Sequence, residues 1–228
     1  MSVGLDLNVL PWAAEGKKMK KHYIFDLDGT LITSGEFIAK GVYDFFDSRG
    51  IAYPPDVVKI IMPMGYPGFA RYAISLGAKG EVDELADKLC EDFKYYYANE
   101  IKLKPFAKEY LERLKGEGVH CHVLTGSPHE LVDVCLKNNG VYGIFENIWS
   151  VDDFGMMKSN PELYKKVADT LGISLSDIVF FDDNLGVIKT CRDIGLETVA
   201  VYDVTSEEYK DDIRAIADKY INSFEELL

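Results

Sequence analysis

Five short apolar runs constrain the fold of this 228-residue chain more than any other feature of its sequence. They lie at His22–Leu27, Val119–Leu124, Ile144–Ser150, Ile178–Phe181 and Thr198–Tyr202. Most are nearly continuous rather than alternating, which is typical of strands buried on both faces of a parallel sheet. Helical patterns separate the later runs, at Ala107–Gly116, His129–Asn138, Pro161–Leu171 and Gly186–Ile194. This alternation predicts an α/β fold with a doubly wound parallel sheet.

The stretch between the first two runs contains no convincing strand. Helical patterns fill it instead, at residues 36–50, 54–62, 67–77 and 81–99. Such a crossover is far longer than a βαβ unit needs, so we expect an inserted α-helical cap domain over residues 35–104. The core would then comprise residues 19–34 and 105–228. We expect the run Tyr95-Tyr96-Tyr97 to pack between cap and core, with pocket lining as the alternative.

The N-terminus and the cysteines indicate the cellular compartment of the protein. Residues 1–18 lack a basic start and have only a short apolar run, so they make a poor signal peptide. We expect Met19 to be the natural start and residues 1–18 to be a leader or N-terminal extension; an ordered arm is the alternative. The four cysteines form no CxxC pair, and no run reaches the ~18 apolar residues that a membrane span requires. We therefore expect a cytoplasmic protein with reduced thiols and no membrane partner.

Two acids stand two residues apart where the first apolar run ends, in the segment Phe25-Asp26-Leu27-Asp28-Gly29-Thr30-Leu31. Residues two apart on a strand share a face. At the carboxyl end of the strand they can converge on a ligand in the crevice where open α/β sheets bind. Gly29 lets the chain turn away, and Thr30 offers a hydroxyl. Such an acidic pair alone is also common in polar turns.

Three further polar segments follow in order. Thr125-Gly126-Ser127 comes after the second apolar run, Lys158 precedes a helix that begins Pro161-Glu162, and Asp182-Asp183-Asn184 follows the fourth run. Together with the first segment they resemble the four motifs of the haloacid dehalogenase-like (HAD) hydrolase superfamily, over roughly residues 20–205. The resemblance is to the phosphatase and phosphoglucomutase-like branch, in which a helical cap lies between motifs one and two.

The resemblance implies a Rossmann-like core and a role for each motif. Asp26 would attack phosphorus and form an aspartyl-phosphate. Asp28 would protonate the leaving group and then activate water, and Lys158 would pair with Asp26 and the transferred group. Thr125 would hold phosphoryl oxygens. The remaining substrate-binding candidates are Gly29, Thr30, Gly126, Ser127 and Arg71, the last for a second anionic group unless it is simply a solvated surface arginine.

The implied cofactor is Mg²⁺, which prefers hard oxygen ligands. It would contact the Asp26 carboxylate, the Asp28 backbone carbonyl and an acid of the fourth motif. Asp183 matches the usual ligand position of the family, and Asp182 would be accessory. Some members carry another acid where this chain has Val187, which increases the expected importance of Asp182.

The net charge of −13 at pH 7 disfavours nucleic acid, because binding to it needs clustered Lys and Arg. It also disfavours binding of a phosphate ester, which is an anion, unless positive charge at the site makes the local electrostatic potential positive. One Mg²⁺ and Lys158 would do so in the cleft. The expected partner is therefore a small phosphorylated metabolite, and the oligomeric state, monomer or homodimer, stays open.

Two positions indicate which of the reactions known for the family this chain would catalyse. Dehalogenating members lack the acid found here at Asp28, so this residue favours phosphoryl transfer. The mutases of this architecture carry a His where this chain has Ile38, which argues against a sugar phosphomutase. We therefore predict a phosphoric monoester hydrolase. The alternatives are a sugar phosphomutase and a catalytically silent binding protein on the same fold.

Overall fold

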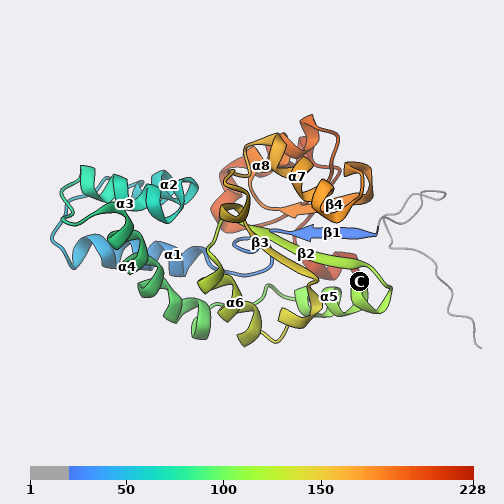
Figure 1. Ribbon diagram of the computed structural model, residues 1–228, viewed down its shortest axis with the longest axis horizontal. Coiled ribbons are helices and arrows are strands. Elements are labelled where there is room, and N and C mark those ends of the chain that lie inside the picture. The colour runs from blue at the N-terminus through green and yellow to red at the C-terminus, as the bar shows by residue number, and fades with distance from the viewer. Residues whose placement is uncertain (1–20) are drawn as a thin grey trace, which may run out of the picture.

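A computed structural model of the protein describes residues 21–228, so the predicted leader over residues 1–18 lies outside the described residues. A parallel sheet with strand order β3-β2-β1-β4-β5-β6 forms its centre (Figure 1). The strands are β1 (His22–Phe25), β2 (His120–Thr125), β3 (Asn147–Ser150), β4 (Ile178–Asp182), β5 (Glu197–Val201) and β6 (Lys219–Ile221). The chain runs outward from β1 to β3 and returns at β4, so the strand order reverses between β1 and β4. Ligands bind at such switch points, and the predicted doubly wound sheet is confirmed.

Both faces of the sheet are buried, which explains why the strands are continuously apolar. Side chains alternate along β1, so that Tyr23 and Phe25 belong to one core and Ile24 to the other. Helices α5 (Ala107–Gly116) and α6 (His129–Asn138) pack on the first face. Helices α7 (Pro161–Leu171) and α8 (Leu185–Asp193) pack on the second (Figure 1).

The sequence analysis missed the C-terminal edge of the sheet and one strand boundary. Strand β6 has three residues, of which only Ile221 is buried, so its pattern is too short to recognise. The preceding helix α9 (Lys210–Ile216) was also not predicted. Strand β3 begins at Asn147 rather than at residue 144, because Tyr142–Ile144 forms a 3₁₀ turn.

Helices fill residues 35–100, between β1 and α5, and they lie beyond the carboxyl end of β1 (Figure 1). They are α1 (Gly35–Asp47), α2 (Val57–Ile61), α3 (Gly65–Ser75), α4 (Val82–Tyr95) and the π-helical segment η2 (Tyr96–Glu100). The predicted helical insert is thus confirmed as an element of the fold, while its bounds at residues 35 and 104 stay a prediction. Within the run Tyr95-Tyr96-Tyr97, Tyr97 is fully buried and Tyr95 is exposed.

Short 3₁₀ segments complete the described chain. They are η1 (Met62–Met64), η3 (Tyr142–Ile144), η4 (Val151–Phe154), η5 (Leu175–Asp177), η6 (Val204–Tyr209) and η7 (Phe224–Leu227). No helix described between residues 21 and 228 combines the length and apolar character that crossing a membrane requires.

Two linkers, residues 31–34 and 101–104, join the insert to the core and are tied to each other. The Thr33 N–H donates to the Lys102 carbonyl at 3.0 Å, and the Lys104 N–H donates to the Leu31 carbonyl at 2.8 Å. The paired linkers start directly after the first acidic motif. They therefore hold the insert next to the carboxyl end of β1.

Candidate active site

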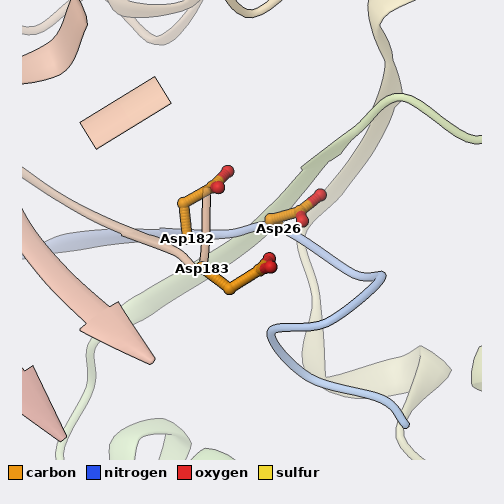
Figure 2. Close-up of side chains that lie close together, drawn as sticks. All are labelled: Asp26, Asp182 and Asp183. Atoms are coloured by element: carbon orange, nitrogen blue, oxygen red, sulfur yellow. The ribbon is translucent and has the colours of Figure 1, made fainter. Parts of the chain in front are cut away.

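Three acids meet at the switch point of the sheet. Asp26 directly follows β1, Asp182 is the last residue of β4, and Asp183 comes next. Because β1 and β4 are neighbours, with the Asp26 N–H donating to the Phe181 carbonyl at 2.9 Å, the three side chains enter one space (Figure 2). One carboxylate oxygen from each lies within 4.8 Å of the others, and all three residues are buried.

Lys158 supplies the positive charge in this cluster. Its ammonium contacts the Asp26 carboxylate and lies 2.9 Å from Asp182 Oδ2. The backbone carbonyl of Lys158 accepts a hydrogen bond of 2.8 Å from the Tyr164 hydroxyl on α7, which anchors the segment. Burial opposes the charged ammonium, but the Asp182 and Asp26 carboxylates outweigh it and raise the pKa of Lys158. The side chain therefore remains a cation.

Burial and mutual repulsion make it unfavourable for these acids to be ionised together. Burial raises the pKa of Asp26 well above its ordinary value; Lys158 opposes this, while Asp182 and Asp183 add to it. Burial and the Asp182 carboxylate also raise the pKa of Asp183. Among the described residues, Lys158 is the ammonium that forms ion pairs within this group of three carboxylates, with Asp26 and Asp182, so a divalent cation would relieve an excess of negative charge. The donor set, all carboxylate oxygens, fits Mg²⁺.

Asp183 and Asp182 have different hydrogen-bond partners. Asp183 accepts from the Thr30 hydroxyl at 3.2 Å and from the Ser206 hydroxyl, on η6, at 3.1 Å. Asp182 accepts from the Asn184 N–H at 2.8 Å, in addition to Lys158. Asp182 thus has one oxygen bonded to the Lys158 ammonium, whereas the described side chains that donate to Asp183 are neutral hydroxyls.

Gly29 makes room for the Asp183 carboxylate. Its φ of 78° lies in the left-handed region, which glycine adopts without strain. A Cβ at this position would lie 2.8 Å from three atoms of the Asp183 carboxyl group. The sequence analysis assigned Gly29 to a turn; the structure adds that a side chain here would displace Asp183.

Asp28 accepts hydrogen bonds from two hydroxyl groups, one from the insert and one from the core. The Tyr97 hydroxyl donates to Oδ1 and the Ser127 hydroxyl donates to Oδ2, both at 2.6 Å. Ser127 is itself held by its N–H, which donates to Thr125 Oγ1 at 3.1 Å. Ser127 lies in the loop after β2, whereas Tyr97 lies in the insert.

The remaining predicted residues are placed as follows. Thr125 is fully buried at the end of β2, and Gly126, next to it, is exposed. Arg71 is exposed on α3 and is not part of the acidic cluster.

The sequence analysis missed Ser206, which has no local signal. It read Tyr97 as packing; its position four residues after Phe93 predicts burial, but not its contact with Asp28.

Known proteins resemble this chain in sequence and in fold. The family model for haloacid dehalogenase-like hydrolases matches residues 20–195. YhcW of Bacillus subtilis, provisionally named a phosphatase, is 29% identical over 185 residues, which cover 80% of this chain and 84% of that protein. Pyrophosphatase PpaX of Halalkalibacterium halodurans is 26% identical over 195 residues, covering 82% and 86%. The crystal structure of CbbY from Rhodobacter sphaeroides in complex with phosphate superposes with a TM-score of 0.77 at 20% identity, covering 90% of this chain and 95% of that one.

Proposed function

This chain belongs to the haloacid dehalogenase-like hydrolase family, and from that premise we propose that it is a Mg²⁺-dependent phosphatase acting on a small phosphomonoester. The observation that carries the proposal is the contact between Lys158 and Asp26 inside the acidic cluster at the switch point. A buried carboxylate paired with a lysine, next to two further acids, suits a phosphoryl-accepting nucleophile beside a cation site.

Asp26 is the proposed nucleophile. In the first step its carboxylate oxygen bonds to phosphorus, the ester P–O bond breaks, and Asp28 gives a proton to the departing oxygen. In the second step Asp28 takes a proton from water, whose oxygen bonds to phosphorus as the bond to Asp26 breaks. Inorganic phosphate leaves, and both acids return to their starting states. Lys158 offsets the negative charge of Asp26 and of the transferred group throughout.

The Asp26 and Asp183 carboxylates and the Asp28 backbone carbonyl are the groups proposed to hold Mg²⁺. The ion would supply positive charge between nucleophile and phosphate when bound. Asp183 is the better candidate of the adjacent acids because the described side chains that donate to it are neutral hydroxyls, whereas Asp182 is paired with Lys158. Asp182 is then an accessory residue that orients the lysine.

Phosphoryl oxygens would be bound by groups at the ends of β1 and β2. Thr125 and Ser127, with the exposed backbone at Gly126, line one side, and Gly29 with Thr30 forms the other. The insert would close over this end of the sheet and exclude water. Arg71 remains our candidate for a second anionic group on the substrate.

The relatives named as phosphatases or pyrophosphatases support hydrolysis rather than mutase chemistry, as does Ile38 at the position where the mutases carry a His. The free thiols, three buried and Cys90 half-buried, support our assignment to the cytoplasm.

Mg²⁺-dependent release of inorganic phosphate tests the proposal. We expect turnover of p-nitrophenyl phosphate and of at least one ester in a panel of sugar phosphates, phosphoglycolate-like acids and nucleotides, and loss of turnover in EDTA. No turnover of any ester with Mg²⁺ would exclude a phosphatase. A sugar phosphate recovered with its phosphate moved to another hydroxyl would identify a mutase.

A further inference from the structure

We propose that Tyr97 is a positioning residue for Asp28, through which the helical insert controls the orientation of the acid–base group. The inference rests on the proposed function, because it gives Tyr97 a role only through the chemistry assigned to Asp28. It goes beyond that function by assigning a residue outside the four motifs.

The hydrogen bonds to Asp28 define the arrangement. Tyr97 and Ser127 each donate to a different carboxylate oxygen at 2.6 Å, and their own oxygens lie 3.4 Å apart. In the carboxylate form that Asp28 takes between the two proposed steps, such short contacts are typical of charge-assisted hydrogen bonds, which are stronger than neutral ones. Rotation of the Asp28 side chain would break both bonds together. The two hydroxyls therefore fix the plane of the carboxylate.

Only one of these two hydroxyls comes from the insert. Asp28 and Ser127 follow neighbouring strands, β1 and β2, so the core alone determines their separation. Tyr97 reaches the same carboxylate from η2, whose residues pack against α6. A displacement of η2 from the core would remove one donor and leave Asp28 held by Ser127 alone.

The backbone around Tyr97 is unusual and well anchored. The Ile101 N–H donates to the Tyr96 carbonyl at 2.9 Å, which closes the π turn directly before the linker 101–104. Single π turns occur mostly within α-helices and are frequent at functional sites. The Tyr97 side chain is 1% exposed, so the ring is fixed as well as the hydroxyl.

The charge of Asp28 acts on two tyrosines of the insert, of which Tyr97 contacts it directly. Burial first, and then the Asp28 charge, raise the pKa of Tyr97 well above its ordinary value, and the same two causes raise the pKa of Tyr66 on α3. The donor role of Tyr97 rests on its geometry, a hydroxyl 2.6 Å from a carboxylate oxygen of Asp28.

The test separates the hydroxyl from the ring. Tyr97→Phe keeps the packing and removes the donor. With saturating Mg²⁺, we expect kcat for p-nitrophenyl phosphate to fall about 10-fold, part of the ~10²–10⁴-fold that a general acid–base group contributes, with KM changed less than about 2-fold. We expect a larger loss with phenyl phosphate, because its more basic leaving group depends more on protonation by Asp28.

A double-mutant cycle shows whether Tyr97 acts through Asp28. Once Asp28→Asn has removed the acid–base group, adding Tyr97→Phe should cost no further activity. Tyr95→Phe is the matched control: it removes a hydroxyl from the same tyrosine run, but one on a side chain that is 61% exposed and bonded to Glu100. We expect its kinetics to equal those of the parent.

Thermal unfolding shows whether each variant is folded under the assay conditions. Should Tyr97→Phe be unfolded, the comparison moves to Tyr97→Gln, which keeps a donor, against Tyr97→Leu, and we expect the Gln variant to be the more active. Parent-like kcat in folded Tyr97→Phe, an equal loss with and without Asp28, or equal Gln and Leu variants would overturn the inference. A parent without Mg²⁺-dependent turnover would overturn the proposed function itself.

Discussion

The ammonium of Lys158 lies 2.9 Å from the carboxylate of Asp182 at the end of β4. The same ammonium contacts Asp26 after β1, so one buried cation joins the two strands of the switch point. The charge is placed where the proposed nucleophile needs it. The arrangement also makes each partner dependent on the other, because a buried charge that loses its partner is costly.

Lys158→Met should lower kcat by about 10²–10³-fold, the loss typical of removing one preorganised electrostatic group. Mg²⁺ binding should persist, since the proposed ligands are intact. Steady-state kinetics and isothermal titration of Mg²⁺ measure the two effects. A variant within about 10-fold of the parent would contradict the role given to Lys158.

The two adjacent acids should respond differently to removal of charge. Asp183→Asn should weaken Mg²⁺ binding more than about 10-fold, because a proposed ligand is lost. Asp182→Asn should leave Mg²⁺ affinity nearly unchanged and lower kcat, because Lys158 loses an anchor. Titration calorimetry ranks the two variants, and the opposite ranking would make Asp182 the principal metal ligand.

Gly29→Ala should reduce both Mg²⁺ affinity and activity, because the new Cβ would lie 2.8 Å from the Asp183 carboxyl group. Gly172→Ala is a matched control for backbone strain. Gly172 has a similar φ of 68°, and a Cβ there has no heavy atom within 4 Å, leaving out its chain neighbours. We expect the control to lose some stability and keep parent activity. Equal activity in the two alanine variants would show that Asp183 can move without consequence.

His122 should make the protein acid-sensitive. It is buried in β2, with Nδ1 accepting from the Asn147 amide at 3.0 Å and Nε2 3.2 Å from His22 Nδ1. Burial, and then His22, lower its pKa from 6.5 to about 4. The unfolded chain therefore binds the proton more readily than the folded one. The free energy of unfolding has its maximum contribution from His122 above pH 6.5 and falls as the pH drops towards 4.

The loss assigned to His122 is at most about 3 kcal/mol. Urea denaturation of the parent and of His122→Gln, at several pH values across this window, measures it. We expect a shallower pH dependence in the variant. Identical slopes would assign the acid sensitivity to other groups.

The sequence was informative about the core because its strands are buried on both faces. Continuous apolar runs located β1, β2, β4 and β5, and Gly- and Pro-bounded helical patterns located the helices between them. Strand β6 was not predicted because three residues, of which only Ile221 is buried, are too few to show a period.

Within the site, too, some contacts could be predicted from the sequence and others could not. Asp26, Asp182 and Asp183 could be expected to meet because the ends of neighbouring parallel strands share one edge. The Tyr97–Asp28 and Ser206–Asp183 contacts could not, because they cross 69 and 23 residues and depend on how η2 and η6 dock. The role of Arg71, which is exposed on α3, stays a prediction.

The central claim is that Asp26 carries the phosphoryl group, and mass spectrometry of the acid-quenched reaction tests it most directly. Asp28→Asn should still be phosphorylated by p-nitrophenyl phosphate, whose leaving group needs little protonation, but should hydrolyse the intermediate slowly for want of a base. With Mg²⁺ present, we predict a phosphoryl group on the peptide containing Asp26 in this variant, and none after the further change Asp26→Asn. Phosphate release by Asp26→Asn at the parent rate, or a phosphoryl group on any other peptide, would contradict the account.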